Sequence, residues 1–196
     1  MKWDKGNIRR IRCFGDSLTA GWGVSPDRGW IALLAERMKG ISFRNYGMPG
    51  AGLSDIFDTA ALQTPAFADG DGLFFMGGTN DILCGLRLSV LEKLFEREIR
   101  KYAAQRPVTI GIPPLTTRKS IDTGWQHEFA FAANQRDLAA YGDFLQALGK
   151  ELSLPLMDCR NILDGEELYG DGLHPNEAGY LKMADYAEKL WRQEEG

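Results

Sequence analysis

The segment "GLFFMGG", residues 72–78, constrains the fold of this chain more than any other. Its apolar residues follow one another without the alternation of apolar and polar positions that marks a strand with one face in water. A strand that is apolar on both faces is typical of a parallel sheet covered by helices on each side. The segment therefore predicts a strand over Gly72–Met76 that is buried between two helical layers.

Short apolar runs alternate with helix-like segments along the whole chain. The predicted strands are Ile8–Phe14, Ile41–Tyr46, Gly72–Met76, Val108–Ile112 and Leu154–Asp158. The predicted helices are Arg28–Lys39, Leu53–Leu62, Ser89–Gln105, Glu128–Leu148 and Pro175–Arg192. Strands that alternate with helices form βαβ units with right-handed crossovers, so the expected fold is a doubly wound α/β sheet.

Two of the predicted helices begin near serines that are candidate caps. Ser54 is a candidate N-cap of the second helix, and Ser89 followed by Glu92 three residues later has the spacing of a capping box. The longest predicted loop runs from Pro113 to His127 and is a candidate lid or binding loop, because loops of this length are uncommon in compact domains.

Composition sets limits on the class of protein. A chain of 196 residues fits one domain, 1–196, that buries a sizeable core without disulfides or a structural metal. A formal net charge of −4 argues against a nucleic-acid partner. We find no segment that approaches the length of a membrane span, and the sequence leaves the oligomeric state open.

The cysteines and the first residues bear on the cellular compartment. Cys13, Cys84 and Cys159 cannot all pair and have no metal-ligand spacing, so we expect reduced, buried thiols. The start, "MKWDKGNIRRIRCF", has no apolar stretch of the length that secretion requires. These two observations predict a cytoplasmic protein.

Glycines and small polar residues follow three of the predicted strands. "GDSLTAG" follows the first strand, "NYGMPGAG" the second and "GGTND" the third, while "DGLHPN" ends the loop after the fifth. Ligands of doubly wound sheets bind at the carboxyl ends of the strands. These four segments are therefore where we expect the functional site.

A serine and a histidine in these segments are suited to nucleophilic catalysis. Serine is a weak nucleophile until a base takes its proton, and the base must be oriented by a third group. The chain has only two histidines, His127 and His174, and His174 lies three residues after Asp171. The residues alone leave open that Ser17 is only a turn hydroxyl, that Asp171 caps the last helix and that His174 is a surface residue.

Acyl transfer also needs hydrogen-bond donors for the oxyanion of the transition state. The backbone N–H groups of Ser17 and Gly50 and the side-chain amide of Asn80 are three candidates from three neighbouring strand ends. Taken singly, "PGAG" is better explained as a turn before a helix and Asn80 as a helix cap, and it is their joint occurrence that favours the oxyanion-hole interpretation. Asp16 and Asp81, beside the glycine turns, are expected to accept hydrogen bonds from backbone N–H groups.

The four segments, in this order, resemble the four sequence blocks of the SGNH hydrolases, the GDSL-type esterase and lipase superfamily. They extend from Gly15 to Asn176, and the family's Ser, Gly, Asn and His are all in place. The resemblance implies a flavodoxin-like three-layer α/β/α sandwich with a five-stranded parallel sheet. It implies Ser17 as nucleophile, His174 as general base and Asp171 as its orienting partner. It also implies Ser17, Gly50 and Asn80 as oxyanion-hole donors, with no metal and no cofactor.

The function expected from this resemblance is a serine esterase that hydrolyses esters of small or medium acyl groups. Acetylated sugars, thioesters and lysophospholipids are all possible substrates. An acyltransferase with the same triad and a non-catalytic flavodoxin-like binding domain are the alternatives. The phosphate-binding patterns G-x-x-x-x-G-K-[ST] and G-x-G-x-x-G are both missing from the sequence, which disfavours a nucleotide binder.

Several apolar residues near the strand ends are candidate contacts of the ester substrate. They are Trp22, Met48, Leu115, Trp125 and Phe129. His127 has only Asp122 as a carboxylate at short spacing upstream and is the weaker candidate base.

Overall fold

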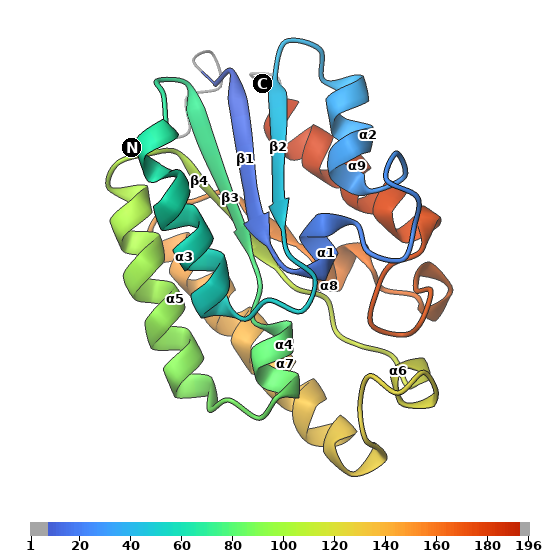
Figure 1. The fold of residues 1–196 in the computed structure, drawn as a ribbon. Helices are drawn as coiled ribbons and strands as arrows, with labels where there is room; N and C mark the ends of the chain where they lie inside the picture. The colour runs from blue at the N-terminus through green and yellow to red at the C-terminus, as the bar shows by residue number, and fades with distance from the viewer. Residues whose placement is uncertain (1–7, 193–196) are drawn as a thin grey trace.

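The computed structural model describes residues 8–192 and contains one five-stranded sheet (Figure 1). The strands are β1 (Arg10–Gly15), β2 (Ser42–Gly47), β3 (Asp71–Met76), β4 (Val108–Ile112) and β5 (Leu156–Asp158). They pair in parallel in the order β2-β1-β3-β4-β5. This is the strand order of flavodoxin-like folds. The predicted fold class is confirmed, and β4 has the predicted bounds.

All five predicted helices form, together with four helical segments of four or five residues. The helices are α1 (Ser17–Ala20), α2 (Trp30–Arg37), α3 (Leu53–Gln63), α4 (Thr79–Leu83), α5 (Leu88–Ala103), α6 (Lys119–Asp122), α7 (Glu128–Glu151), α8 (Cys159–Ile162) and α9 (Glu177–Arg192). Two 3₁₀ turns, η2 (Thr64–Ala66) and η3 (Glu166–Leu168), complete the described elements. Within residues 8–192, no helix combines the length and apolarity needed to cross a membrane.

Strand β3 contributes to two separate cores, one on each face of the sheet. Phe74 and Met76 pack with buried residues of α2, α8 and α9. Leu73 and Phe75 pack with buried residues of α3, α5 and α7 on the opposite face (Figure 1). The side chains of a strand alternate between its faces, so a run without polar positions places apolar side chains in both cores. The prediction from "GLFFMGG" is therefore correct.

The predicted caps of two helices are wrong. Helix α3 begins at Leu53, so Ser54 lies inside it, and the Gly52 N–H donates to the Asp55 carboxylate at 3.0 Å. Helix α5 begins at Leu88 after Arg87, which leaves Ser89 inside the first turn and makes no capping box there.

One of the three cysteines differs from expectation. Cys13 and Cys159 are buried free thiols, and burial raises the pKa of both. Cys84 is exposed, because it ends the short helix α4 and lies outside both cores.

Three strands end level with one another at the carboxyl edge of the sheet. Gly15 of β1 is in register with Gly47 of β2 and with Met76 of β3. The segments that follow these three residues therefore leave the sheet side by side. This register brings Ser17, Gly50 and Asn80 to one edge.

Candidate active site

Ser17 is the first residue of α1, in a tight turn directly after β1. The Asp16 carboxylate caps this helix by accepting the Leu18 N–H at 2.9 Å. A Cβ atom on Gly15 would lie 2.0 Å from Thr19 Oγ1 and 2.5 Å from the Met76 carbonyl oxygen, so the turn requires glycine there. At the start of a helix the Ser17 N–H has no intrahelical acceptor.

Asp171 and His174 lie on a closed loop just before α9. Tyr169 and Pro175 form an antiparallel bridge, and the Gly170 N–H donates to the His174 carbonyl at 2.8 Å. Inside this loop Asp171 Oδ1 accepts the backbone N–H of His174 at 2.7 Å. Helix α9 is capped instead by Asn176, whose Oδ1 accepts the Gly179 N–H at 3.1 Å, so the reading of Asp171 as its cap is wrong.

His174 connects Asp171 to Ser17. Its Nδ1 lies 2.8 Å from Asp171 Oδ2, and its Nε2 lies 2.9 Å from Ser17 Oγ. The imidazole is buried, with only 4% of the residue exposed, so His174 is no surface residue. A carboxylate on Nδ1–H leaves Nε2 free to accept the serine hydroxyl proton.

The Asp171 carboxyl is held in its ionised form. Partial burial raises its pKa, but hydrogen bonds from the His174 ring and from the N–H groups of His174 and Leu173 outweigh this effect. The pKa of Asp171 is therefore lowered, which favours the charged form that orients a neutral imidazole.

Gly50 and Asn80 follow the ends of the neighbouring strands β2 and β3. Gly50 has φ +82° in a turn closed by the Ala51 N–H to Met48 carbonyl bond of 3.0 Å. The Asn80 amide nitrogen donates to the Ala51 carbonyl at 2.9 Å. An asparagine amide has two N–H groups, so this bond orients the side chain and leaves its second donor for a ligand.

The two carboxylates beside the glycine turns bind backbone N–H groups, as expected. Asp16 accepts from Leu18, and Asp81 Oδ2 accepts the Leu53 N–H at 3.0 Å. The second bond ties α4, which bears Asn80, to the start of α3.

Of the predicted substrate contacts, the two tryptophans lie beside His174. The Trp22 ring is 6.2 Å from the imidazole and the Trp125 ring is 4.9 Å from it. The Trp125 indole N–H also donates to Asp171 Oδ2 at 2.7 Å, a contact that no sequence pattern indicated.

The other predicted contacts have different surroundings. The Met48 sulfur accepts a hydrogen bond from Thr59 of α3, and its side chain packs on the α3 side of the sheet. Phe129 is exposed and stacks on His127, which precedes α7. The Leu115 carbonyl accepts the Tyr169 hydroxyl at 2.8 Å.

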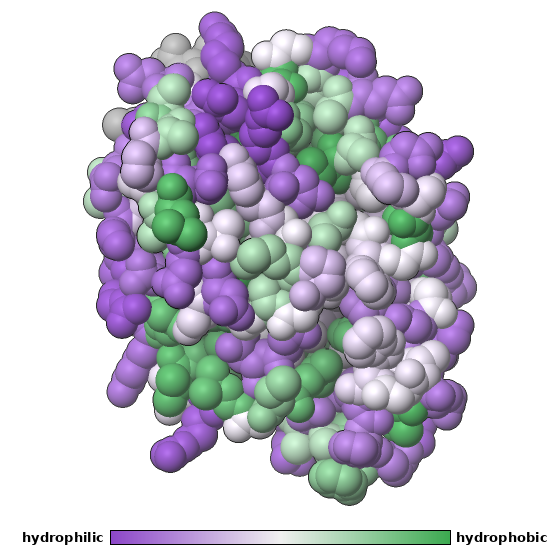
Figure 2. All heavy atoms as spheres, viewed as in Figure 1, coloured by the Kyte–Doolittle hydropathy of each residue, from purple (hydrophilic) through white to green (hydrophobic). Residues whose placement is uncertain are grey.

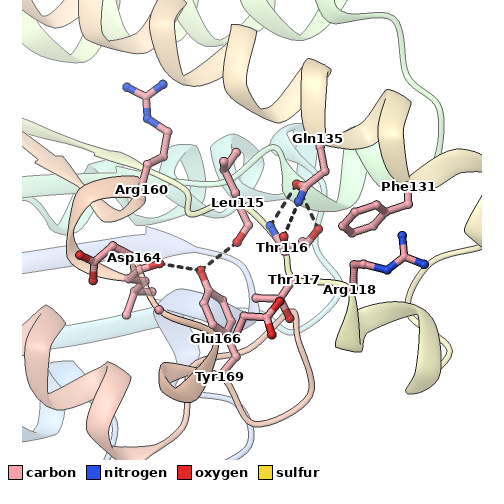
Figure 3. Close-up of a pocket in the computed structure, with 12 residues that line it drawn as sticks. Leu115, Thr116, Thr117, Arg118, Phe131, Gln135, Arg160, Asp164, Glu166 and Tyr169 are labelled. Carbon is pink, nitrogen blue, oxygen red and sulfur yellow. Dashed lines mark hydrogen bonds between the residues drawn. The ribbon is translucent and has the colours of Figure 1, made fainter.

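Leu115 also lines a separate pocket of about 380 Å³ (Figure 3). Residues of the Pro113–His127 loop, of α7 and of the segment around η3 surround it, among them Thr117, Arg118, Phe131, Glu166 and Tyr169. Ser17, Asp171 and His174 are not in its lining.

On the molecular surface, hydrophobic residues gather over the lower parts of α4 and α5, where Leu86 and Val90 are exposed (Figure 2).

The chain is similar to known proteins over most of its length. The sequence model of the "GDSL-like Lipase/Acylhydrolase family" matches residues 13–182. A structure of a member of the lipolytic protein G-D-S-L family from Veillonella parvula superposes with a TM-score of 0.80, at 26% identity, over 92% of this chain and 96% of that one.

Two esterases are more distant relatives. An acetylxylan esterase of Xylanibacter ruminicola is 23% identical over 92% of this chain, which spans only 42% of that protein. A structure of another acetyl xylan esterase has a TM-score of 0.73 at 22% identity, over 91% of this chain and 97% of that one.

Proposed function

Because this chain belongs to the GDSL-like lipase/acylhydrolase family and is a carboxylic ester hydrolase, we propose that it uses Ser17, His174 and Asp171 as its catalytic triad. The observation that carries the proposal is the contact of 2.9 Å between Ser17 Oγ and His174 Nε2, residues 157 positions apart. With the Asp171 bond to Nδ1, this contact has the geometry of a nucleophile, a base and an orienting carboxylate.

The proposed reaction has two acyl-transfer steps. Ser17 Oγ attacks the ester carbonyl carbon while His174 Nε2 takes its proton, and the carbonyl oxygen becomes an oxyanion. Collapse of this intermediate breaks the bond to the alcohol, which leaves with the proton from His174. Water then attacks the acyl-Ser17 ester with His174 again as base, and the acid and the free serine are released.

The oxyanion is stabilised by the N–H groups of Ser17 and Gly50 and by the Asn80 amide. The level ends of β1, β2 and β3 support this assignment, because Ser17, Gly50 and Asn80 follow them at one edge of the sheet. The Ala51 carbonyl fixes the Asn80 amide in advance, so its donor needs no reorganisation during the reaction.

For the substrate we propose small or medium acyl esters, with acetylated carbohydrates first among them. The acetylxylan esterases among the relatives support this order. We place hydrolysis before acyl transfer to another alcohol because the matching family is one of lipases and acylhydrolases.

The test is covalent labelling of the wild type and of Ser17→Ala with a fluorophosphonate probe. We expect one adduct, mapped to Ser17, and loss of p-nitrophenyl acetate turnover in Ser17→Ala. Ser89→Ala, at the first turn of α5, is the matched control and should react like the wild type. Equal turnover in the wild type and Ser17→Ala would refute the proposed triad.

A series of nitrophenyl esters of increasing chain length, with acetylated xylo-oligosaccharides beside it, tests the substrate. A sharp preference for acetyl and release of acetate from the sugar support the proposed order. Higher kcat/KM for long acyl chains would contradict it.

A further inference from the structure

We propose that Trp125 is a positioning residue, whose indole N–H fixes the Asp171 carboxylate that orients His174. The inference rests on the proposed triad and adds a fourth side chain to it. The loop from Pro113 to His127 would then support the orienting carboxylate of Asp171 rather than act as a lid.

Trp125 contacts both the Asp171 carboxylate and the His174 imidazole. Its Nε1–H donates to Asp171 Oδ2 at 2.7 Å, and the same oxygen lies 2.8 Å from His174 Nδ1. Its ring meets the imidazole edge to face, with centroids 4.9 Å apart and an interplanar angle of 78°. Two donors converge on one carboxylate oxygen, so the carboxylate cannot rotate without breaking one of these bonds.

The rest of the segment packs against the backbone of Asp171 and Gly172. Thr123 Oγ1 donates to the Asp171 carbonyl at 2.6 Å, and the Thr117 N–H donates to the Gly172 carbonyl at 2.8 Å. A Cβ atom on Gly172 would lie 2.2 Å from the Ser120 nitrogen. The backbone at Gly172 therefore lies so close to the backbone at Ser120 that no side chain fits between them.

A buried polar network anchors this segment to α7. Gln126 is 7% exposed, and its amide nitrogen donates to Thr116 Oγ1 at 2.7 Å and Ser120 Oγ at 2.8 Å. Its amide oxygen accepts from Asn134 of α7 at 2.8 Å. Gln135, on the same helix, hydrogen-bonds the Thr116 backbone and hydroxyl (Figure 3). Trp125 thus acts on Asp171 from a support that is itself fixed.

The chemistry of the indole suits this role. Its N–H is a donor only and does not titrate, so it binds the ionised carboxylate at every working pH. A hydrogen bond to a charged group of this kind corresponds to about 10- to 100-fold in rate when it acts in the transition state. Because Trp125 acts through Asp171, its loss should lower kcat and leave KM unchanged.

The test removes the indole N–H and keeps an aromatic side chain. Trp125→Phe and the substitution of Trp125 by 3-benzothienylalanine, which has sulfur in place of the indole N–H, are each assayed with p-nitrophenyl acetate. We expect kcat to fall about 10- to 100-fold at unchanged KM in both. Trp191→Phe is the matched control, since the Trp191 N–H donates to Thr109 at 3.1 Å in the core, and its kcat should equal that of the wild type.

A second measurement does not depend on turnover. In ¹H–¹⁵N spectra of Ser17→Ala protein, the Trp125 indole resonance should move when Asp171→Asn is added. The His174 Nδ1–H resonance should move in the 3-benzothienylalanine variant, which keeps a bicyclic ring beside the imidazole. These shifts test the hydrogen bond from Trp125 to Asp171 even if the protein proves to have no esterase activity.

Two results would overturn the inference. A raised KM with unchanged kcat would make Trp125 a substrate contact alone. Unmoved resonances would show that its N–H does not act on Asp171.

Discussion

Asp171 holds His174 at two points, because one carboxylate oxygen accepts the backbone N–H at 2.7 Å and the other accepts the ring Nδ1–H at 2.8 Å. The backbone bond fixes where the residue lies, and the ring bond fixes how the imidazole is turned. Three residues of chain are enough for both, since the loop is closed by the bridge between Tyr169 and Pro175.

The substitution Asp171→Asn should reduce kcat while the protein stays folded. The amide has one acceptor oxygen in place of two, so the donors from the backbone and the His174 ring can no longer both be satisfied. The equivalent change in a serine protease lowers kcat about 10⁴-fold, which is the scale expected here. Steady-state kinetics with p-nitrophenyl acetate and a thermal melt check it, with exposed Asp58→Asn of α3 as control. A loss below tenfold would count against the orienting role.

Loss of the Asn80 donor should slow acylation without weakening substrate binding. Removal of one oxyanion donor costs about 10²–10³ in kcat in other enzymes. We expect this loss in Asn80→Ala and at least as large a loss in Asn80→Asp, which keeps the shape but places negative charge near the oxyanion. Single-turnover kinetics measure the step directly. An Asn80→Asp variant more active than Asn80→Ala would contradict the proposal.

Much of the candidate site could be predicted because its residues follow strand ends. Ser17, Gly50 and Asn80 lie within a few residues of Gly15, Gly47 and Met76, whose register is set by parallel pairing. The bond from Trp125 to Asp171 could not be predicted in this way. It joins two loops 46 residues apart through a side chain whose sequence neighbours show no periodicity.

Two helices begin earlier than their candidate capping serines indicate. Ser54 and Ser89 have good capping chemistry, but α3 and α5 begin one residue before each of them. Tertiary contacts decide such ends, as the bond from the Leu53 N–H to Asp81 shows. The extent of the domain, 1–196, and the cytoplasmic location stay predictions.

Stability should fall with rising pH because of Asp16. Burial raises the pKa of this carboxyl to about 7, and the nearby Asp81 charge adds to the effect, while the bond from Leu18 opposes it. The unfolded group has a pKa of about 3.9, so between these values the folded protein holds a proton that the unfolded chain releases. The free energy of unfolding should therefore decrease by up to about 1.4 kcal/mol per pH unit across this window and level off above it.

Asp16→Asn should remove this pH dependence. Its amide oxygen still accepts the Leu18 N–H, and no charge is buried above pH 7. The free energy of unfolding is measured with urea at pH 5 and at pH 8. The value for the variant minus that for the wild type should be larger at pH 8. If the two proteins differ by the same free energy of unfolding at pH 5 and at pH 8, Asp16 does not titrate in this range.

Gly78→Ala should destabilise the protein more than Gly85→Ala. Both glycines have positive φ, +107° and +81°, where a side chain costs about 1–2 kcal/mol. A Cβ atom on Gly78 would also lie 2.6 Å from the ring of buried Tyr141, whereas Gly85 has no atom within 4 Å of that position. This steric clash should lower the free energy of unfolding by a further ~1–3 kcal/mol, as measured by chemical denaturation. Tyr141→Leu in the Gly78→Ala background should recover part of it, and equal losses in the two alanine variants would refute the account.

Two residues of the proposed triad come later in the chain than all five strands of the sheet. The last strand ends at Asp158, whereas Asp171 and His174 come after it. During synthesis Ser17 and every strand of the sheet leave the ribosome before His174, the proposed base. A nascent chain therefore has the proposed nucleophile and the whole sheet before it has the proposed base, so no esterase activity is expected until synthesis has passed His174.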